Sequence, residues 1–241
     1  MRSTENVQAL LFDVFGTVVD WRSSCIRQLS AFGHGRGIAD VDWEAFADRW
    51  RGLYQPSMEE CRAGRRVFTL LDDLHRESLI KLLGEAGVSN LTADETEYLV
   101  SIWHRLTPWP DVVDGLKRLK KRYIIATLSN GNIGLMTRLA KYGGLPWDAI
   151  LGAEIARAYK PQSEAYQQTA AALLLEPSQC MMVAAHNDDL RAAAGEGYRT
   201  AFVVRPQEFG SNQLQDRAAD EAWDVTSDSF HGLADAMGCP L

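Results

Sequence analysis

The strongest constraint on the fold is a short apolar run that occurs five times along the chain. The first run, residues 7–12, is Val-Gln-Ala-Leu-Leu-Phe and ends at an acid, Asp13. The other runs cover residues 123–128, 149–152, 180–185 and 200–204, and helical patterns at 111–121, 133–142, 163–175 and 190–196 lie between the runs. Such alternation of buried strands and helices predicts an α/β fold with a doubly wound parallel sheet.

Residues 20–105 carry a different pattern. They contain four amphipathic stretches, residues 24–32, 43–54, 70–83 and 94–104, and almost no strand signal. Because this insertion leaves the first strand and returns to the second, it predicts a helical cap domain (20–105) over the strand ends of a core formed by residues 1–19 and 106–241. The polar stretch 207–221 is predicted to be a mobile surface loop.

Charge and length exclude several classes of function. A net charge of -7 leaves no overall basic surface for nucleic acid, so a small-molecule ligand is favoured. The polar start and the short run at residues 7–12 do not resemble a signal peptide, and no apolar run has the length of a membrane span. We therefore expect a cytoplasmic protein with no membrane partner.

The four cysteines give no sign of a disulfide or metal site. Cys25, Cys61, Cys180 and Cys239 are dispersed, without a CxxC pair or a His/Cys cluster at metal-ligand spacing. We interpret them as reduced thiols.

Asp13 is the first candidate for catalysis. It ends the first predicted strand and is followed by Gly16 and Thr17, so its carboxylate can project into the crevice at the strand ends, where the turn supplies backbone N–H groups. A carboxylate so placed suits a nucleophile. From its position alone, Asp13 could equally well be an aspartate that caps a turn.

Three further polar motifs lie downstream of Asp13, and together they favour a nucleophile over a turn cap. Asp13-Val14-Phe15-Gly16-Thr17, Ser129-Asn130, Lys160-Pro161 and Asp188-Asp189 resemble, in order and approximate spacing, the four motifs of the haloacid dehalogenase (HAD) superfamily. The resemblance spans nearly the whole chain. It implies a HAD-like Rossmannoid core, a nucleophilic aspartate on the first strand, a Ser or Thr and a Lys that orient substrate and nucleophile, and acids on the fourth loop.

Phe15 narrows the reaction. The superfamily's phosphatases carry at this position a second acid that protonates the leaving group. A phenyl ring cannot donate a proton, whereas a halide leaves as a weak base that needs none. Phe15 followed by Gly-Thr is similar to the pattern of the L-2-haloacid dehalogenases (type II), in which it would also form an apolar wall of the substrate site; core packing is the alternative.

The same resemblance assigns further residues. In the cap, Trp50-Arg51 resembles the stretch from which these dehalogenases supply a cationic halide acceptor, here Arg51; a solvated arginine on an amphipathic helix is the alternative. Ser129 would contact the substrate carboxylate or the nucleophile, and Asn130 the halide or substrate, although both are common in turns. The resemblance also places Thr17 among the catalytic residues. It places Lys160 beside Asp13, where its charge would keep the nucleophile ionised. Tyr166 would support the site from the following helix, or else would simply pack on the sheet.

The fourth loop departs from the dehalogenase pattern, which places a Ser and an Asn before the final Asp. Here those positions are Ala184 and His186. Asp189 is retained where the family orients water or the lysine during ester hydrolysis. His186 would contact substrate or position water, or else bond a neighbouring carbonyl. The pair Asp188-Asp189 also admits a Mg²⁺ site with Asp13, as in the phosphatases.

We therefore expect hydrolysis of short 2-haloacids to 2-hydroxy acids and halide through an ester on Asp13, with no metal and no cofactor. Water, oriented by Asp189, would hydrolyse the ester. The alternatives are a Mg²⁺-dependent phosphatase and a non-catalytic protein of this fold. Tyr54 and Phe68 are candidate pocket walls. Apolar stretches exposed on the cap would support a homodimer.

Overall fold

The computed structural model describes residues 4–239. Its main sheet has the strand order β5-β4-β1-β6-β7-β8, and all neighbouring strands are parallel. The strands are β1 (Ala9–Phe12), β4 (Ile124–Ser129), β5 (Ala149–Gly152), β6 (Cys180–Ala184), β7 (Arg199–Val203) and β8 (Val225–Ser227). The expected α/β fold is confirmed. Because β1 lies between β4 and β6, its carboxyl end is at the middle of the sheet edge.

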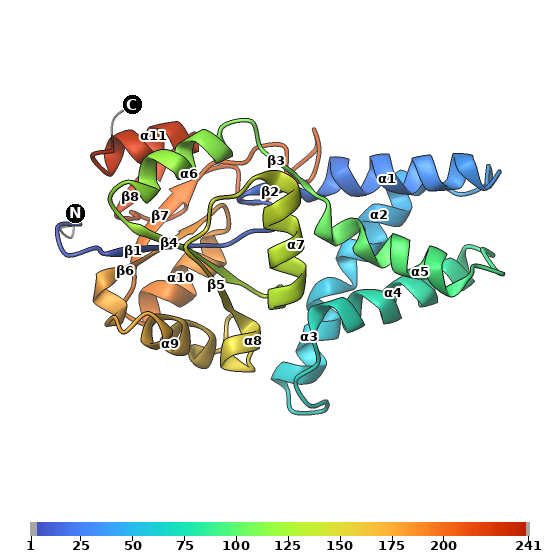
Figure 1. Cartoon of the computed structure of the whole chain (residues 1–241), viewed down its shortest axis with the longest axis horizontal. Coiled ribbons are helices and arrows are strands. Elements are labelled where there is room, and N and C mark those ends of the chain that lie inside the picture. Colours follow the sequence, from blue (N-terminus) through green and yellow to red (C-terminus); the bar gives the residue numbers. More distant parts are fainter. Residues whose placement is uncertain (1–3, 240–241) are drawn as a thin grey trace.

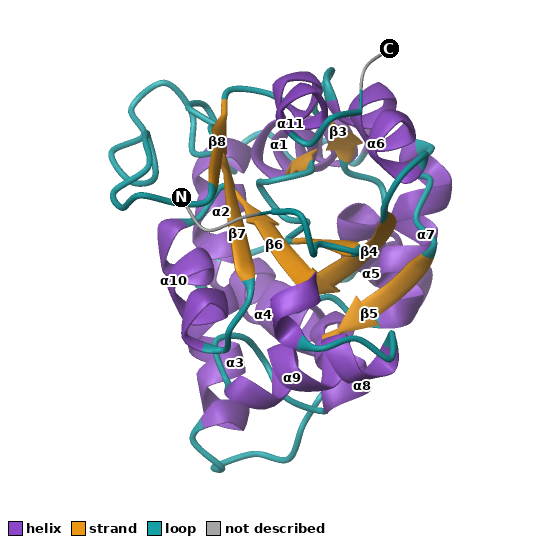
Figure 2. Ribbon diagram, turned by 90° about the vertical axis from the view of Figure 1, so that its left-hand side faces the viewer, coloured by secondary structure: helices purple, strands orange, loops and turns teal. Residues whose placement is uncertain are grey.

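Helices cover both faces of the sheet (Figure 2). One face packs against α6 (Val112–Lys120), α7 (Ile133–Gly143) and α11 (Phe230–Ala236), and the other against α9 (Ser163–Ala172) and α10 (Asn187–Gly195). Along β1, Leu10 and Phe12 join the first of these cores while Ala9 and Leu11 join the second, as the alternation of side chains on a strand requires. The short elements α8 (Ala153–Ala156) and η2 (Pro177–Gln179) complete the connections.

Helices also form the segment between β1 and β4. They are α1 (Trp21–Gly35), α2 (Trp43–Gly52), α3 (Tyr54–Arg62), α4 (Leu71–Glu85) and α5 (Ala93–Val100), followed by the 3₁₀ turn η1 (Ser101–His104). They lie beyond the carboxyl ends of the strands (Figure 1). A small antiparallel ribbon of β2 (Val19–Asp20) and β3 (Thr107–Pro108) joins them to the sheet. The apolar core is continuous between the two parts.

The elements with strong periodicity were predicted to within a few residues, and the weak ones were missed. The predicted stretch 43–54 ends in fact at Gly52, and a separate helix, α3, begins at Tyr54. β8 and α11 had no clear sequence signal. The prediction of a surface loop at 207–221 is wrong for Glu208 and Gln213, which are buried. No helix within residues 4–239 is long and apolar enough to cross a membrane.

Candidate active site

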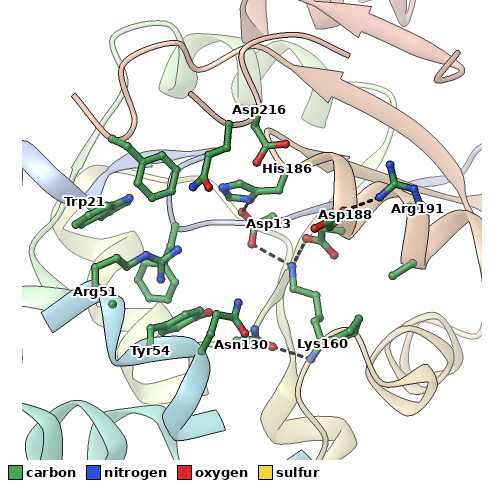
Figure 3. Close-up of a pocket in the computed structure, with 18 of the residues that line it drawn as sticks. Asp13, Trp21, Arg51, Tyr54, Asn130, Lys160, His186, Asp188, Arg191 and Asp216 are labelled. Atoms are coloured by element: carbon green, nitrogen blue, oxygen red, sulfur yellow. Dashed lines mark hydrogen bonds and ion pairs between the residues drawn. The ribbon is translucent and has the colours of Figure 1, made fainter. Parts of the chain in front are cut away.

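The strand-end residues meet at one cavity of about 990 Å³ between the sheet and the helices α2 and α3. Asp13 follows β1, Asn130 follows β4, and His186 follows β6, while Lys160 precedes α9. Figure 3 shows these side chains facing Arg51 and Tyr54, which come from α2 and α3. Residues far apart in the sequence therefore converge because parallel strands end at the same edge.

Asp13 is buried, and both of its carboxylate oxygens have donors. The Thr17 hydroxyl donates to Oδ2 over 2.8 Å, and the Lys160 ammonium donates to Oδ1 over 3.0 Å. Thr17 in turn accepts the backbone N–H of Ala185. Burial alone would raise the pKa of Asp13, but the charges and hydrogen bonds of Lys160 and His186 hold that pKa well below its usual range. Asp13 is therefore an oriented carboxylate anion.

Lys160 joins Asp13 to the fourth loop. Its ammonium also donates to Asp189 Oδ2, while the Tyr166 hydroxyl donates to Asp189 Oδ1 over 2.8 Å. Burial lowers the pKa of Lys160, but the two carboxylates raise it by more, so the side chain is an ammonium ion. The backbone N–H of Lys160 donates to Asn130 Oδ1 over 2.8 Å, which ties the second and third motifs together.

His186 lies between two carboxylates. Its Nδ1 is 3.3 Å from Asp13 Oδ2, and its Nε2 is 2.9 Å from Oε2 of Glu208. The Trp21 indole N–H donates to the other oxygen of Glu208 over 3.0 Å. Burial lowers the pKa of His186, but Glu208 and Asp13 raise it well above its usual value, so the imidazole carries a proton on both nitrogens.

Gly16 makes room for this arrangement. Its φ is +90°, and a Cβ at this position would lie 2.1 Å from Glu208 Oε1. Any other residue would strain the backbone and push the Glu208 carboxylate away.

Arg51 forms the cationic side of the cavity. Its guanidinium lies 4.1 Å from the Tyr54 ring centroid and 5.3 Å from that of Trp21, and its Nη1 is buried without a hydrogen-bond partner. Among residues 4–239, the other buried side-chain polar atoms without a partner are both ring nitrogens of His75 and Nε1 of Trp103. All three residues surround Phe15. The buried Nη1 of Arg51, a charged N–H donor without a protein partner, suits a small anion.

Comparison with known proteins agrees with this geometry. The family model of the haloacid dehalogenase-like hydrolases matches residues 7–197. The chain belongs to this family. Among solved structures, it is similar to a defluorinating L-2-haloacid dehalogenase (46% identity, TM-score 0.94, covering 96% of this chain and 95% of that one). It is also similar to a second L-2-haloacid dehalogenase (43% identity, TM-score 0.93, 96% and 99% covered). An (S)-2-haloacid dehalogenase of Pseudomonas sp. strain YL is 26% identical over 92% of this chain and 91% of its own.

In this haloacid dehalogenase-like hydrolase, three predicted residues lie differently from expectation. Ser129 is fully buried, and its Oγ accepts the N–H of Gly131 instead of lining the cavity. Asp188 is almost fully exposed and pairs with Arg191. Tyr54 lines the cavity, but Phe68 packs on Tyr159, with ring centroids 5.1 Å apart.

The structure of this family member also brings in residues that sequence reasoning missed. Glu208 lies in the polar stretch after β7, where no periodicity marks it. His75 and Trp103 lie on apolar faces of α4 and η1, where they resemble ordinary core residues. Within residues 4–239, no group of three or more His, Cys, Asp or Glu side chains is placed to hold a metal ion.

Proposed function

We propose that the protein hydrolyses short 2-haloacids to 2-hydroxy acids through an ester on Asp13. The observation that carries this proposal is an anionic, fully oriented Asp13 carboxylate in one cavity with the buried, unpartnered Nη1 of Arg51. A nucleophile and an anion acceptor thus share a space large enough for a small acid. The names of the two relatives above 40% identity support the substrate class.

In the first step, an oxygen of Asp13 attacks C2 of the haloacid opposite the carbon–halogen bond. The new C–O bond forms as the halide leaves with the bonding electron pair, so C2 inverts. Arg51 and Asn130, which both line the cavity, stabilise the charge that develops on the halide. Lys160 and Thr17 hold the carboxylate in position, which supplies the orientational part of the rate enhancement.

In the second step, water attacks the carboxyl carbon of Asp13. The ester bond between that carbon and the substrate oxygen breaks, and the 2-hydroxy acid leaves with the oxygen that Asp13 contributed. Asp13 keeps one oxygen from water. Asp189 acts here through Lys160, because its two oxygens are bonded to Lys160 and Tyr166.

The environment of Phe15 favours halide over phosphate ester as the leaving group. Its ring is buried and packs edge-on to Tyr54, His75 and Trp103, with centroids 5.6 to 6.4 Å away. Burial lowers the pKa of His75 to about 3, so this imidazole is neutral and cannot supply a proton at neutral pH. The phosphatase alternative therefore lacks an acid at this position.

Single-turnover hydrolysis in ¹⁸O-water tests the mechanism. With enzyme in excess over 2-chloropropionate, mass spectrometry of the Asp13 peptide should find the label in Asp13 and none in the first product. Label in the product and not in Asp13 would mean direct attack of water on C2. Asp13→Asn should show neither halide release nor label.

Halide release from chloro-, bromo- and fluoroacetate, with and without EDTA, tests the substrate class. Fluoroacetate belongs in this panel because one relative is named as defluorinating. Release that EDTA abolishes would favour a metal-dependent hydrolase. No release from any haloacid would favour a non-catalytic protein of this fold.

We further propose that residues 20–105 act as a cap that excludes water from the cavity, and that the protein is a cytoplasmic homodimer. The four cysteines are free, as in a reducing compartment. Val67, Ile80 and Tyr98 expose apolar surface on the proposed cap, and a second copy of the chain would cover it. Light scattering of the purified protein in solution measures the oligomeric state.

A further inference from the structure

Glu208 is a fully buried carboxylate, and both of its oxygens bond to residues that line the cavity. Its two oxygens are bonded to His186 Nε2 and to the Trp21 indole N–H, and it lies against Gly16, three residues after the nucleophile. A buried carboxylate is costly unless its partners satisfy it. Here one partner is a histidine that itself touches Asp13, so Glu208 acts on the nucleophile through His186.

Among the other groups at Asp13, none is as well placed to take a proton from water. Asp189 has Lys160 on one oxygen and Tyr166 on the other. Thr17 donates to Asp13 and accepts from the Ala185 N–H. His186 Nδ1, by contrast, points at Asp13 from the cavity side, 3.3 Å from Oδ2 (Figure 3). A water over the carboxyl carbon of Asp13 would lie within hydrogen-bonding reach of this nitrogen.

We propose that His186 is the general base for hydrolysis of the Asp13 ester, and that Glu208 is the positioning residue that keeps its Nε2 protonated. This inference rests on the proposed dehalogenase function. The hydrogen bond to Glu208 fixes the tautomer, so the lone pair of the neutral imidazole is on Nδ1 and faces the ester.

Formation of the ester switches His186 from acid to base. In the resting enzyme, the carboxylates of Asp13 and Glu208 both face the imidazole and hold it as a cation. Alkylation of Asp13 removes one of these negative charges, while Lys160 stays cationic nearby. His186 then releases its Nδ1 proton to solvent. The base is thereby generated only after the first step is complete, when it is needed.

The protons balance through the second step. Nδ1 takes a proton from water as the water oxygen bonds to the carboxyl carbon of Asp13. The tetrahedral intermediate expels the alkoxide of the 2-hydroxy acid, which takes that proton from Nδ1. Asp13 remains as the neutral acid and passes its proton to Nδ1, which restores the resting pair.

Glu208→Gln separates the two steps. The glutamine keeps an acceptor for Trp21, but its NH₂ group donates to His186 Nε2 and so forces the proton onto Nδ1, where it blocks the base. In rapid-quench experiments with 2-chloropropionate, halide should appear in a burst of one equivalent per site at the wild-type rate. Steady-state turnover should fall by about 10²-fold or more, as expected for loss of a general base. Intact-protein mass spectrometry should then find the Asp13 ester accumulated.

Glu77→Gln is the matched control, since Glu77 pairs with Arg66 on the surface of the proposed cap, away from the cavity. It should leave both rates unchanged. His186→Gln gives a second test should Glu208→Gln not fold, and it should accumulate the same ester. In the wild type, single-turnover ester hydrolysis should rise with pH to a plateau, and this dependence should be absent from both site variants.

The inference is overturned if burst and steady-state rates fall together in Glu208→Gln and His186→Gln with no ester accumulated, because a merely structural role would affect both steps. Absence of any halide release from 2-chloropropionate by the wild type would instead contradict the dehalogenase function itself.

Discussion

The ammonium of Lys160 lies 3.0 Å from Asp13 Oδ1 and also donates to Asp189. It is thus a cation that two buried carboxylates share. A positive charge that keeps Asp13 ionised is thus part of the chain itself.

The first prediction concerns metal removal. Because the Lys160 ammonium already supplies a positive charge beside Asp13, an excess of EDTA should leave halide release unchanged. Added Mg²⁺ should not increase it. The measurement is initial halide release after dialysis against chelator. A rate restored only by Mg²⁺ would contradict the assignment of Lys160.

The second prediction is that Lys160→Met both inactivates and destabilises the protein. Two buried carboxylates would lose their shared cation, which typically costs about 3–5 kcal/mol of the free energy of unfolding. Urea denaturation at neutral pH measures this loss, and halide release measures activity. Lys117→Met is the control, since Lys117 is exposed and pairs with Asp114 three residues away. Equal stability of the two variants would be evidence against a buried ion triad.

The third prediction separates activity from stability at Arg51. Arg51→Met should slow the halide burst by about 10²–10³-fold, because the acceptor of the developing halide charge is lost. The free energy of unfolding should stay within about 1 kcal/mol, since Nη1 has no partner to leave unpaired and the aromatic contacts of Tyr54 can accept a thioether. A stability loss above about 3 kcal/mol, the size expected when a buried ion pair is broken, would show that Arg51 instead holds the helices of the proposed cap together.

The fourth prediction concerns acid stability. Burial lowers the pKa of His75 to about 3, so between pH 6.5 and about 3 the unfolded chain binds a proton that the folded protein does not. His75 therefore reduces stability as the pH falls through this window, by about 1.4 kcal/mol per pH unit. Asp13, whose pKa is lowered in the folded protein, adds to the loss below pH 3.8, where the unfolded chain binds a proton that the folded carboxylate does not.

His75→Phe isolates this contribution. Phenylalanine retains the stack on Trp103, whose centroid lies 4.4 Å away, and has no proton to bind. The difference in the free energy of unfolding between variant and wild type should be constant above pH 6.5 and should grow in favour of the variant below it. Parallel curves from pH 7 to pH 4 would mean that His75 titrates normally.

The positions of the four motifs along the chain were predictable from the sequence. The contacts that their side chains make were predictable only in part. Asp13 and Ser129-Asn130 end strongly apolar runs, and the ends of parallel strands meet at one edge for geometric reasons. Yet Ser129 turned out to be fully buried and Asp188 exposed, because a strand end does not fix the direction of each following side chain. Loop backbone conformation decides that direction.

Glu208 is the site residue that was hardest to predict from the sequence. It is 187 residues from Trp21, it lies in a polar stretch with no periodicity, and nothing in its neighbourhood distinguishes it from a surface acid. The signal that could have found it was chemical: His186 replaces the usual asparagine, and a buried imidazole needs an acceptor for its second nitrogen.

The sequence by itself determined the order of strands and helices, the helical insertion after the first strand, and the place of Asp13 at that strand's end, because side-chain periodicity and turn chemistry are local properties. Only the tertiary structure decided that Lys160 bridges two acids, that Nη1 of Arg51 is buried without a hydrogen-bond partner, and that Glu208 bonds to His186. Hydrogen bonds and burial depend on segments distant in the sequence, which packing alone brings together.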